Sequence, residues 1–198
     1  ESSPSPANPG DVSGTVVFWD TSDSTNEAPT FKDLIKKFEA EYPNVKVDYQ
    51  NVPFSEAQNK YKTAAQADNA PDVLRAEVAW TPEFASLGYL LPLTGTSLDT
   101  PDAYLPTPWS SNVYEDVVYG VPQVTDAPGL LYNKELLDKA GVEAPKTWDD
   151  VQAASEKLKA EGVDTLYSAT GGYFTLPYIY SFGGNTVDPA EQKILIND

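Results

Sequence analysis

The chain has 198 residues, 40% of them hydrophobic, which is enough to fold as one large or two small domains. Its 30 Asp and Glu residues against 13 Lys and Arg give a net charge of -17, which argues against nucleic acid and anionic lipid as partners. Cysteine, histidine and methionine are absent, and with them thiol nucleophiles, imidazole bases and the usual zinc ligands. The remaining hydroxyl, carboxylate, amide and aromatic groups favour recognition over catalysis, so we expect no catalytic residue, metal or cofactor.

The first residues have the composition of a tether. The opening sequence ESSPSPANPG combines prolines with serines and an asparagine, and it cannot contribute to a packed core. We therefore predict that residues 1–12 form a disordered Ser/Pro-rich tether. The alternative is a disordered chain end without a function.

Helices and strands then alternate. A buried strand is predicted over Thr15–Trp19, and apolar residues at helical spacing predict a helix that ends at Tyr42-Pro43-Asn44. Residues 45–49 alternate as a strand, and Ser55–Gln58 has the pattern of a capping box that opens a helix through Ala67.

A short apolar strand, Val73–Leu74, follows, and Thr81-Pro82 starts another helix that Gly88 closes. Strands separated by helices of this length indicate crossover connections and a mainly parallel sheet. The sequence therefore predicts an α/β lobe over residues 13–125.

The segment from Tyr119 onward indicates a change of lobe. An apolar extended run ends at Thr125-Asp-Ala-Pro-Gly129, and a second apolar run, Leu130–Tyr132, restarts at once. A helix over Glu135–Ala140, stopped by Gly141, and a second helix capped by Thr147 come next. A strand, a polar crossing and a strand are typical of a hinge, so residues 126–198 are predicted to begin a second lobe.

Several motifs in order resemble one protein family, the extracellular solute-binding proteins of ABC sugar transporters, of the maltose and maltodextrin-binding type. The opening strand Gly14-Thr-Val-Val-Phe-Trp-Asp20, the strand Ala70-Pro-Asp-Val-Leu74 and the crossover Leu131-Tyr-Asn-Lys134 with Pro145-Lys-Thr-Trp148 are similar to segments of that family. Gly171-Gly-Tyr-Phe-Thr-Leu-Pro177 is similar to its second-lobe segment with a sugar-facing tyrosine.

The resemblance implies a two-lobed periplasmic-binding-protein-like fold of type II, with mainly parallel sheets flanked by helices. It implies a monomeric extracellular or periplasmic receptor, often lipid-anchored, that delivers sugar to an ABC permease. Members of the family are longer than this chain, and the apolar triplet Ile194-Leu-Ile196 is an unusual place for a protein to end. We therefore expect a truncated fold, the N-terminal part of a receptor that a C-terminal portion completes.

Polar loops follow the predicted strands of the first lobe. Ligands of such sheets bind outside the carboxyl ends of the strands, where this chain carries carboxylates and aromatic rings. Carboxylates accept hydrogen bonds from sugar hydroxyls, and aromatic rings cover the apolar face of a sugar. We predict Asp23, Glu77 and Asp126 as hydroxyl acceptors and Trp80 and Tyr173 as stacking rings.

The resemblance supports these five residues unequally. Asp23, Asp126 and Tyr173 match positions where the family's motifs have ligand contacts, whereas the segment from Glu77 to Trp80 departs from the family's best-known pattern, an aspartate followed by an arginine.

Each of the first three residues also has a structural interpretation. Asp23 is an ordinary turn or cap residue, Glu77 is a surface charge or a partner of Arg75, and Trp80 is a core residue. For Asp126, inside the crossover, and Tyr173, after two glycines, ligand binding is the better interpretation.

Two other functions stay open at the level of sequence. A secreted glycoside hydrolase also needs two carboxylates beside aromatic residues, although it requires one of them to be held protonated in an apolar pocket. No such pocket is evident around Asp23 or Asp126. A surface adhesion module would bind protein in place of sugar.

Overall fold

The computed structural model describes residues 8–164, 166–188 and 190–196. The chain forms two compact units, unit 1 up to Thr125 and unit 2 from Asp126. Residues 1–7 of the predicted tether lie outside the described residues. Its last part is a turn in which Asp11 N donates to Asn8 O over 2.9 Å, and Asn44 Nδ2 donates to Gly10 O over 3.1 Å.

Unit 1 contains a parallel sheet and the longest strands among the described residues. Its elements in chain order are β1 (Gly14–Asp20), α1 (Ala28–Glu41), β2 (Val45–Asn51), α2 (Phe54–Gln66), β3 (Val73–Leu74), α3 (Trp80–Ser86), the 3-10 turn η1 (Pro101–Ala103), α4 (Pro106–Ser110), β4 (Val113–Tyr114) and β5 (Val117–Val118). The strand order is β2-β1-β3, and β1 runs parallel to both neighbours. The short strands β4 and β5 pair separately and antiparallel.

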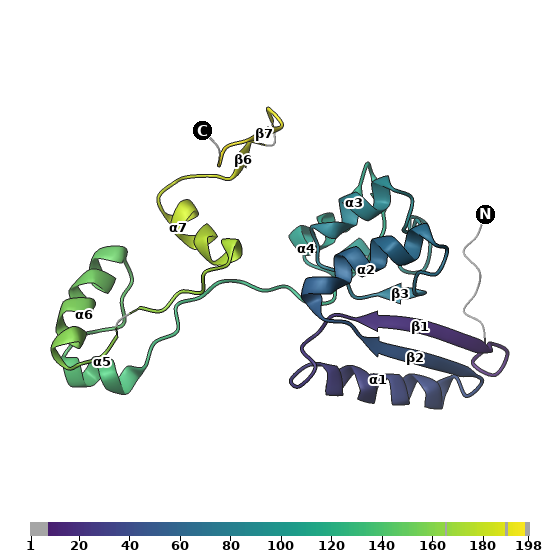
Figure 1. Cartoon of the computed structure of the whole chain (residues 1–198), viewed down its shortest axis with the longest axis horizontal. Coiled ribbons are helices and arrows are strands. Elements are labelled where there is room, and N and C mark those ends of the chain that lie inside the picture. The colour runs from purple at the N-terminus through teal and green to yellow at the C-terminus, as the bar shows by residue number, and fades with distance from the viewer. Residues whose placement is uncertain (1–7, 165, 189, 197–198) are drawn as a thin grey trace. The chain divides into compact units, whose positions relative to one another are not determined.

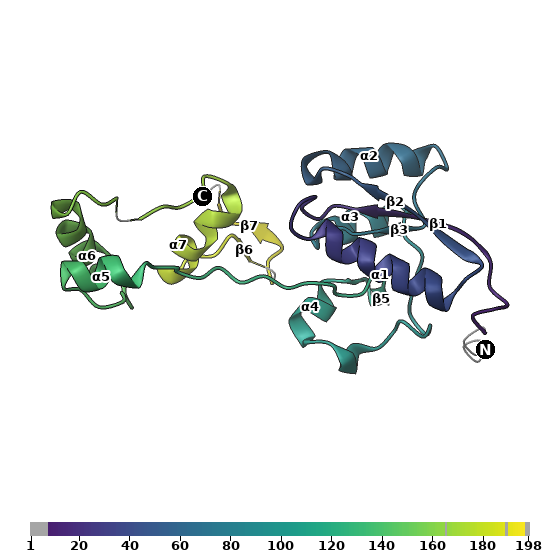
Figure 2. The same cartoon turned by 90° about the horizontal axis from the view of Figure 1, so that it is seen from below.

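Helices cover both faces of this sheet (Figure 1, Figure 2), α1 on one side and α2 with α3 on the other. Successive side chains of a strand point to opposite faces, so β1 needs apolar residues on both. Phe18 meets Phe31 of α1 at a centroid distance of 6.2 Å, whereas Trp19 belongs to the cluster on the other face. The predicted core position of Trp19 is confirmed by its 7% exposure.

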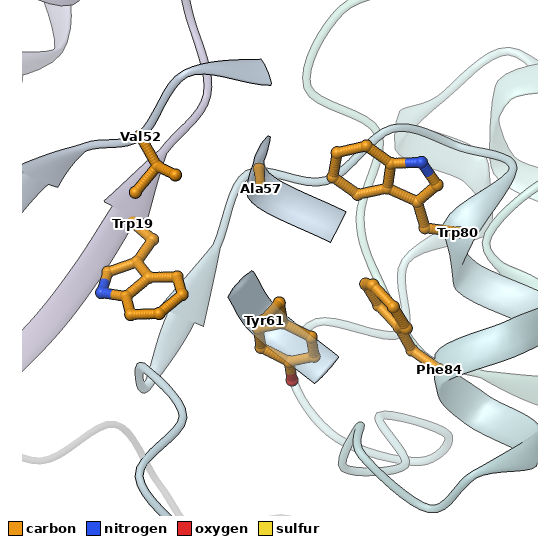
Figure 3. Packing of buried hydrophobic residues seen from close by; sticks show 6 residues of the cluster. All are labelled: Trp19, Val52, Ala57, Tyr61, Trp80 and Phe84. Atoms are coloured by element: carbon orange, nitrogen blue, oxygen red, sulfur yellow. The ribbon is translucent and has the colours of Figure 1, made fainter. Parts of the chain in front are cut away.

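The main core of unit 1 lies between β1, α2 and α3. Figure 3 shows its six buried members, which are Trp19, Val52, Ala57, Tyr61, Trp80 and Phe84. The Tyr61 ring packs against Phe84 with a centroid distance of 4.7 Å, and its hydroxyl donates to Tyr89 O over 2.7 Å. Burying this apolar surface stabilises unit 1.

Unit 2 has a helical part and a short hairpin. Its elements are α5 (Lys134–Ala140), α6 (Trp148–Ala160), the 3-10 turn η2 (Gly172–Thr175), α7 (Leu176–Ser181), β6 (Val187–Asp188) and β7 (Lys193–Ile194). Leu137 of α5 packs on Ala154 and Leu158 of α6. Trp148 stacks on Tyr178 of α7 at a centroid distance of 4.9 Å. The strands β6 and β7 pair antiparallel.

Three local predictions are decided by the structure. Gly141 ends α5 in the left-handed region, with φ of 64°, as predicted. The predicted capping box at Ser55 is wrong, because α2 begins at Phe54 after Pro53 and has no side-chain cap. The predicted strand Leu130–Tyr132 is also not formed, and Leu131 is 96% exposed. A strand requires a pairing partner, and no described segment supplies one to these residues.

None of the described helices is both long and apolar enough to cross a membrane.

Candidate functional site

Two of the predicted acceptors lie at the same edge of the parallel sheet. Asp23 follows the end of β1 by three residues, and Glu77 follows the end of β3 by three residues. Because β1 and β3 are adjacent and parallel, their carboxyl ends open onto one edge, where ligands of such sheets bind. The fold therefore places both carboxylates on loops of the expected edge.

Asp23 is exposed and organises its own loop. Its Oδ1 accepts from Thr25 N over 2.9 Å, from Thr25 Oγ1 over 2.6 Å and from Asn26 N over 2.7 Å. These bonds, with that from the Thr25 hydroxyl the largest, lower the pKa of Asp23 below its ordinary value of 3.8. Oδ2 accepts no hydrogen bond from the described residues, so one acceptor oxygen of an ionised carboxylate remains for a ligand. The local turn role and a binding role are thus compatible.

Glu77 is half-buried and sits at the start of α3. Its Oε2 accepts from Ala79 N over 2.8 Å, and its carbonyl accepts from Trp80 N over 3.0 Å. The alternative in which Glu77 pairs with Arg75 is wrong for the described contacts, because Arg75 pairs with Glu27 at 3.5 Å. Glu77 therefore ties the loop after β3 to the first turn of α3.

Trp80 is a core residue in this structure. The residue is 8% exposed, and its ring stacks on Phe54 at a centroid distance of 5.2 Å and lies 6.1 Å from the ring of Phe84. Figure 3 shows it next to Phe84 in the buried cluster. These contacts favour the structural interpretation of Trp80, since both neighbours already cover its ring, and its predicted stacking on a ligand gains no support.

Asp126 and Tyr173 belong to unit 2. Asp126 is its first residue, exposed and in a stretch without regular secondary structure. Tyr173 lies in η2, is 50% exposed and meets Phe174 edge-on at 5.4 Å. Both side chains are open to solvent, but no contact among the described residues joins one to the other. Their common role as ligand contacts stays a prediction.

A hydrogen-bond network around Arg75, which the sequence analysis did not identify, connects the loops at the sheet edge. Arg75 Nε donates to Gln123 Oε1 over 2.9 Å, and Nη2 lies 3.5 Å from Glu27 Oε1. Glu27 in turn accepts from Asp23 N over 3.0 Å, through Oε2. Thr21 Oγ1 donates to the carbonyl of Arg75 over 2.9 Å. The network thus links the loop of Asp23 to Gln123, which lies 48 positions after Arg75 in the sequence.

A buried carboxylate supports the end of β1. Asp20 is fully buried and accepts from Ser22 N over 2.9 Å and from Tyr49 Oη over 2.6 Å. Burial and this carboxylate raise the pKa of Tyr49 to about 12. In the sequence, Asp20, Thr21 and Ser22 look like the start of a polar loop, but all three are buried. They hold the loop in place and do not face solvent.

The described residues contain no group of three or more Asp or Glu positioned to hold a metal ion.

Comparisons with known proteins converge on one family. The family model described as bacterial extracellular solute-binding protein matches residues 22–198. The GacH receptor of Streptomyces glaucescens GLA.O, solved unliganded and in complex with acarbose, is similar to this chain at 43% identity and a TM-score of 0.85. The similarity covers 94% of this chain and 49% of that receptor.

Two further proteins are similar to the chain. Maltose-bound MalE3 of T. maritima is 25% identical with a TM-score of 0.70, over 93% of this chain and 49% of that one. The arabinooligosaccharide-binding protein of Halalkalibacterium halodurans is 28% identical over 86% of this chain and 39% of that protein. The chain thus spans about half the length of the matched structures and about two fifths of the curated relatives.

Proposed function

Because this chain belongs to the family of bacterial extracellular solute-binding proteins, we propose that its protein is a sugar receptor of an ABC importer. The receptor captures an oligosaccharide of the maltose or maltodextrin type between two lobes and delivers it to the permease. The observation that carries the proposal is the position of Asp23 and Glu77 at the carboxyl edge of one parallel sheet.

The chemistry of this edge suits a neutral, hydroxyl-rich ligand. Hydrogen bonds from Thr25 and Asn26 lower the pKa of Asp23, so its carboxylate is ionised at neutral pH and accepts charge-assisted bonds from hydroxyls. A general acid of a glycoside hydrolase needs the opposite, a raised pKa. The net charge of -17 further favours a neutral ligand over an anion.

The class of sugar is proposed from the relatives. GacH was solved with acarbose and MalE3 with maltose, and a curated relative is named for arabino-oligosaccharides. GacH is 43% identical to the chain, against 28% for the arabinooligosaccharide-binding protein and 25% for MalE3, which favours a ligand of the acarbose and maltose class over an arabino-oligosaccharide.

Binding is proposed to act through closure of the two lobes. Residues 119–133, which cross the boundary between the units, contain no helix or strand. A sugar that contacts Asp23 and Glu77 on one side and Asp126 and Tyr173 on the other would bind the closed form more tightly, and that difference in affinity drives closure. The permease then recognises the closed receptor.

The location and the partners are proposed from the family to which the chain belongs. We place the receptor outside the cytoplasmic membrane, either in the periplasm or extracellular, with the Pro-rich residues 1–12 as a tether to a lipid anchor. The partners are the carbohydrate and the ABC permease, and the receptor works as a monomer.

Calorimetry on the complete gene product tests the proposal. We expect maltotriose to bind, arabinotriose to bind more weakly, and chromatography to recover the bound sugar intact. Absence of binding to every saccharide would overturn the receptor proposal, and release of shorter sugars would indicate a hydrolase.

The variant Asp126→Ala tests one predicted contact. Loss of a charge-assisted hydrogen bond should weaken maltotriose binding by more than about 1 kcal/mol. Asp138→Ala is a suitable control, because Asp138 is exposed on α5 and pairs only with Lys134 among the described residues. An unchanged affinity in Asp126→Ala would remove Asp126 from the site.

A further inference from the structure

A small groove of unit 1 lies directly before the boundary between the two units. Its volume is about 270 Å³. We call it the Gln123 groove, and the residues that line it are Ala103, Tyr104, Leu105, Pro108, Pro122, Gln123, Val124 and Thr125. The volume is slightly below the roughly 300–1,000 Å³ typical of ligand pockets. The groove therefore suits one sugar ring and not a longer chain.

One wall of the groove is a fixed aromatic ring. Tyr104 stacks on Trp109 of α4 with a centroid distance of 5.5 Å and an angle of 21° between the rings. Trp109 occupies one face of the Tyr104 ring, and the ring lines the groove while remaining partly exposed. An aromatic surface beside apolar Leu105 and Val124 suits the C–H face of a sugar.

Gln123 brings the polar group of the groove, and Arg75 sets its orientation. Arg75 Nε donates to Gln123 Oε1 over 2.9 Å, which assigns the oxygen of the amide to the guanidinium. An amide has two N–H donors on its nitrogen, and no hydrogen bond from Gln123 Nε2 is found among the described residues. Gln123 therefore offers donors at an edge where Asp23 and Glu77 can only accept.

The arginine itself is held from several sides. Its backbone N donates to Trp19 O over 2.9 Å, and its carbonyl accepts from Thr21 Oγ1 over 2.9 Å. Its side chain is only 18% exposed, and its guanidinium also lies beside Glu27. A side chain anchored this way presents Gln123 in one orientation before any ligand arrives, which lowers the entropic cost of binding.

From these contacts we infer that Gln123 is a specificity-determining residue of the sugar site, donating from Nε2 to a ring or glycosidic oxygen, which can only accept, of one sugar unit held against Tyr104. Arg75 is its positioning residue. The inference rests on the proposed receptor function and adds to it a donor and a subsite. An oligosaccharide would place one ring in the Gln123 groove and its other rings beyond it.

The variant Gln123→Glu separates donation to sugar from a structural role. A carboxylate at this position still accepts from Arg75, so the fold should be as stable as in the natural protein or more stable. It has no N–H donor, so we expect the affinity for maltotriose to fall at least about tenfold, because one hydrogen bond is lost and an acceptor of the ligand is left unpaired.

Gln66→Glu is the matched control. Gln66 is exposed and is the last residue of α2. This helix runs from the carboxyl end of β2 to the amino end of β3, so Gln66 lies at the edge of the sheet opposite to Asp23 and Glu77. The same change of charge there should leave the affinity unaltered. Both variants are compared by calorimetry on the complete gene product, with unfolding by denaturant as the measure of stability.

The role of Arg75 is tested by a double-mutant cycle. If Arg75 acts by orienting Gln123, Arg75→Met should weaken maltotriose binding in the natural background and have little further effect in Gln123→Ala. Additive losses would show that Arg75 acts independently of Gln123 and would overturn its positioning role.

The two proposals fail differently. Maltotriose binding that is as tight in Gln123→Glu as in the natural protein would overturn the inference while leaving the receptor function intact. A natural protein that binds no saccharide would overturn the receptor function itself.

Discussion

At the scale of single residues, the side chain at the sheet edge whose role the contacts define best is Asp20, which does not face solvent. It is fully buried and receives hydrogen bonds from Ser22 and from Tyr49 Oη. A buried carboxylate is tolerated only when such bonds satisfy it. Asp20 therefore fixes the start of the loop that carries Asp23.

Asp20→Ala should lower the free energy of unfolding by about 3 kcal/mol. The substitution leaves the donors of Ser22 and Tyr49 without their acceptor, at about 1–3 kcal/mol for each buried group. Denaturant unfolding measures the loss. The control Asp48→Ala removes an exposed carboxylate of β2 that accepts from Gln50, and it should change stability by less than about 0.5 kcal/mol. Equal effects of the two variants would contradict the role given to Asp20.

Residue type alone does not distinguish the buried Asp20 from the exposed Asp23. The sequence has Asp20 and Asp23 three positions apart in one polar stretch, and both looked like loop residues. Burial depends on Tyr49, which lies on the neighbouring strand and 29 positions away in sequence. The network of Arg75 with Gln123 was not predicted for the same reason, since its partners meet only in the folded sheet.

At the scale of elements, the start of α6 shows a cap that local sequence does encode. Thr147 Oγ1 accepts from Asp150 N over 3.1 Å, and Asp150 Oδ2 accepts from Thr147 N over 2.9 Å. Both partners lie within four residues, so the motif was predictable from Thr147 onward. At Ser55 a similar pattern failed, because Pro53 and Phe54 already begin α2. A cap motif therefore indicates that a helix is present more reliably than it indicates the residue at which the helix begins.

Thr147→Ala should destabilise unit 2 by about 1 kcal/mol, because one N–H of the first turn loses its acceptor. Thr147→Ser keeps the hydroxyl and should be close to neutral. Denaturant unfolding followed by tryptophan fluorescence can report the change, since Trp148 is the first residue of α6. An alanine variant as stable as the serine variant would contradict the cap.

The same motif has a pH dependence with a defined sign. Hydrogen bonds from the backbone of Lys146 and from Thr147 lower the pKa of Asp150 below its ordinary value of 3.8. The unfolded chain therefore binds a proton at higher pH than the folded one. The stabilisation by Asp150 is fully present above pH 3.8 and is lost as the pH falls through its lowered value.

At the scale of the whole molecule, the alternation of strands and helices along the sequence was enough to predict most of the fold of unit 1. The order β1, α1, β2, α2, β3 was predictable from apolar periodicity, and parallel pairing follows from the helical crossovers. The absence of a strand at Leu130–Tyr132 was not predictable, because a strand depends on a pairing partner outside its own sequence. The position of Asp23 and Glu77 at one edge of the sheet was predictable, whereas the burial of Trp80 depends on the packing of α2 and α3.

The central claim, that the two units grip a sugar together, predicts a change of shape on binding. Small-angle X-ray scattering of the complete gene product, without sugar and with saturating maltotriose, measures it directly. We expect the radius of gyration to decrease with sugar, and Asp126→Ala to need more sugar for the same decrease. Saturation by calorimetry with no change in the radius of gyration would contradict the claim.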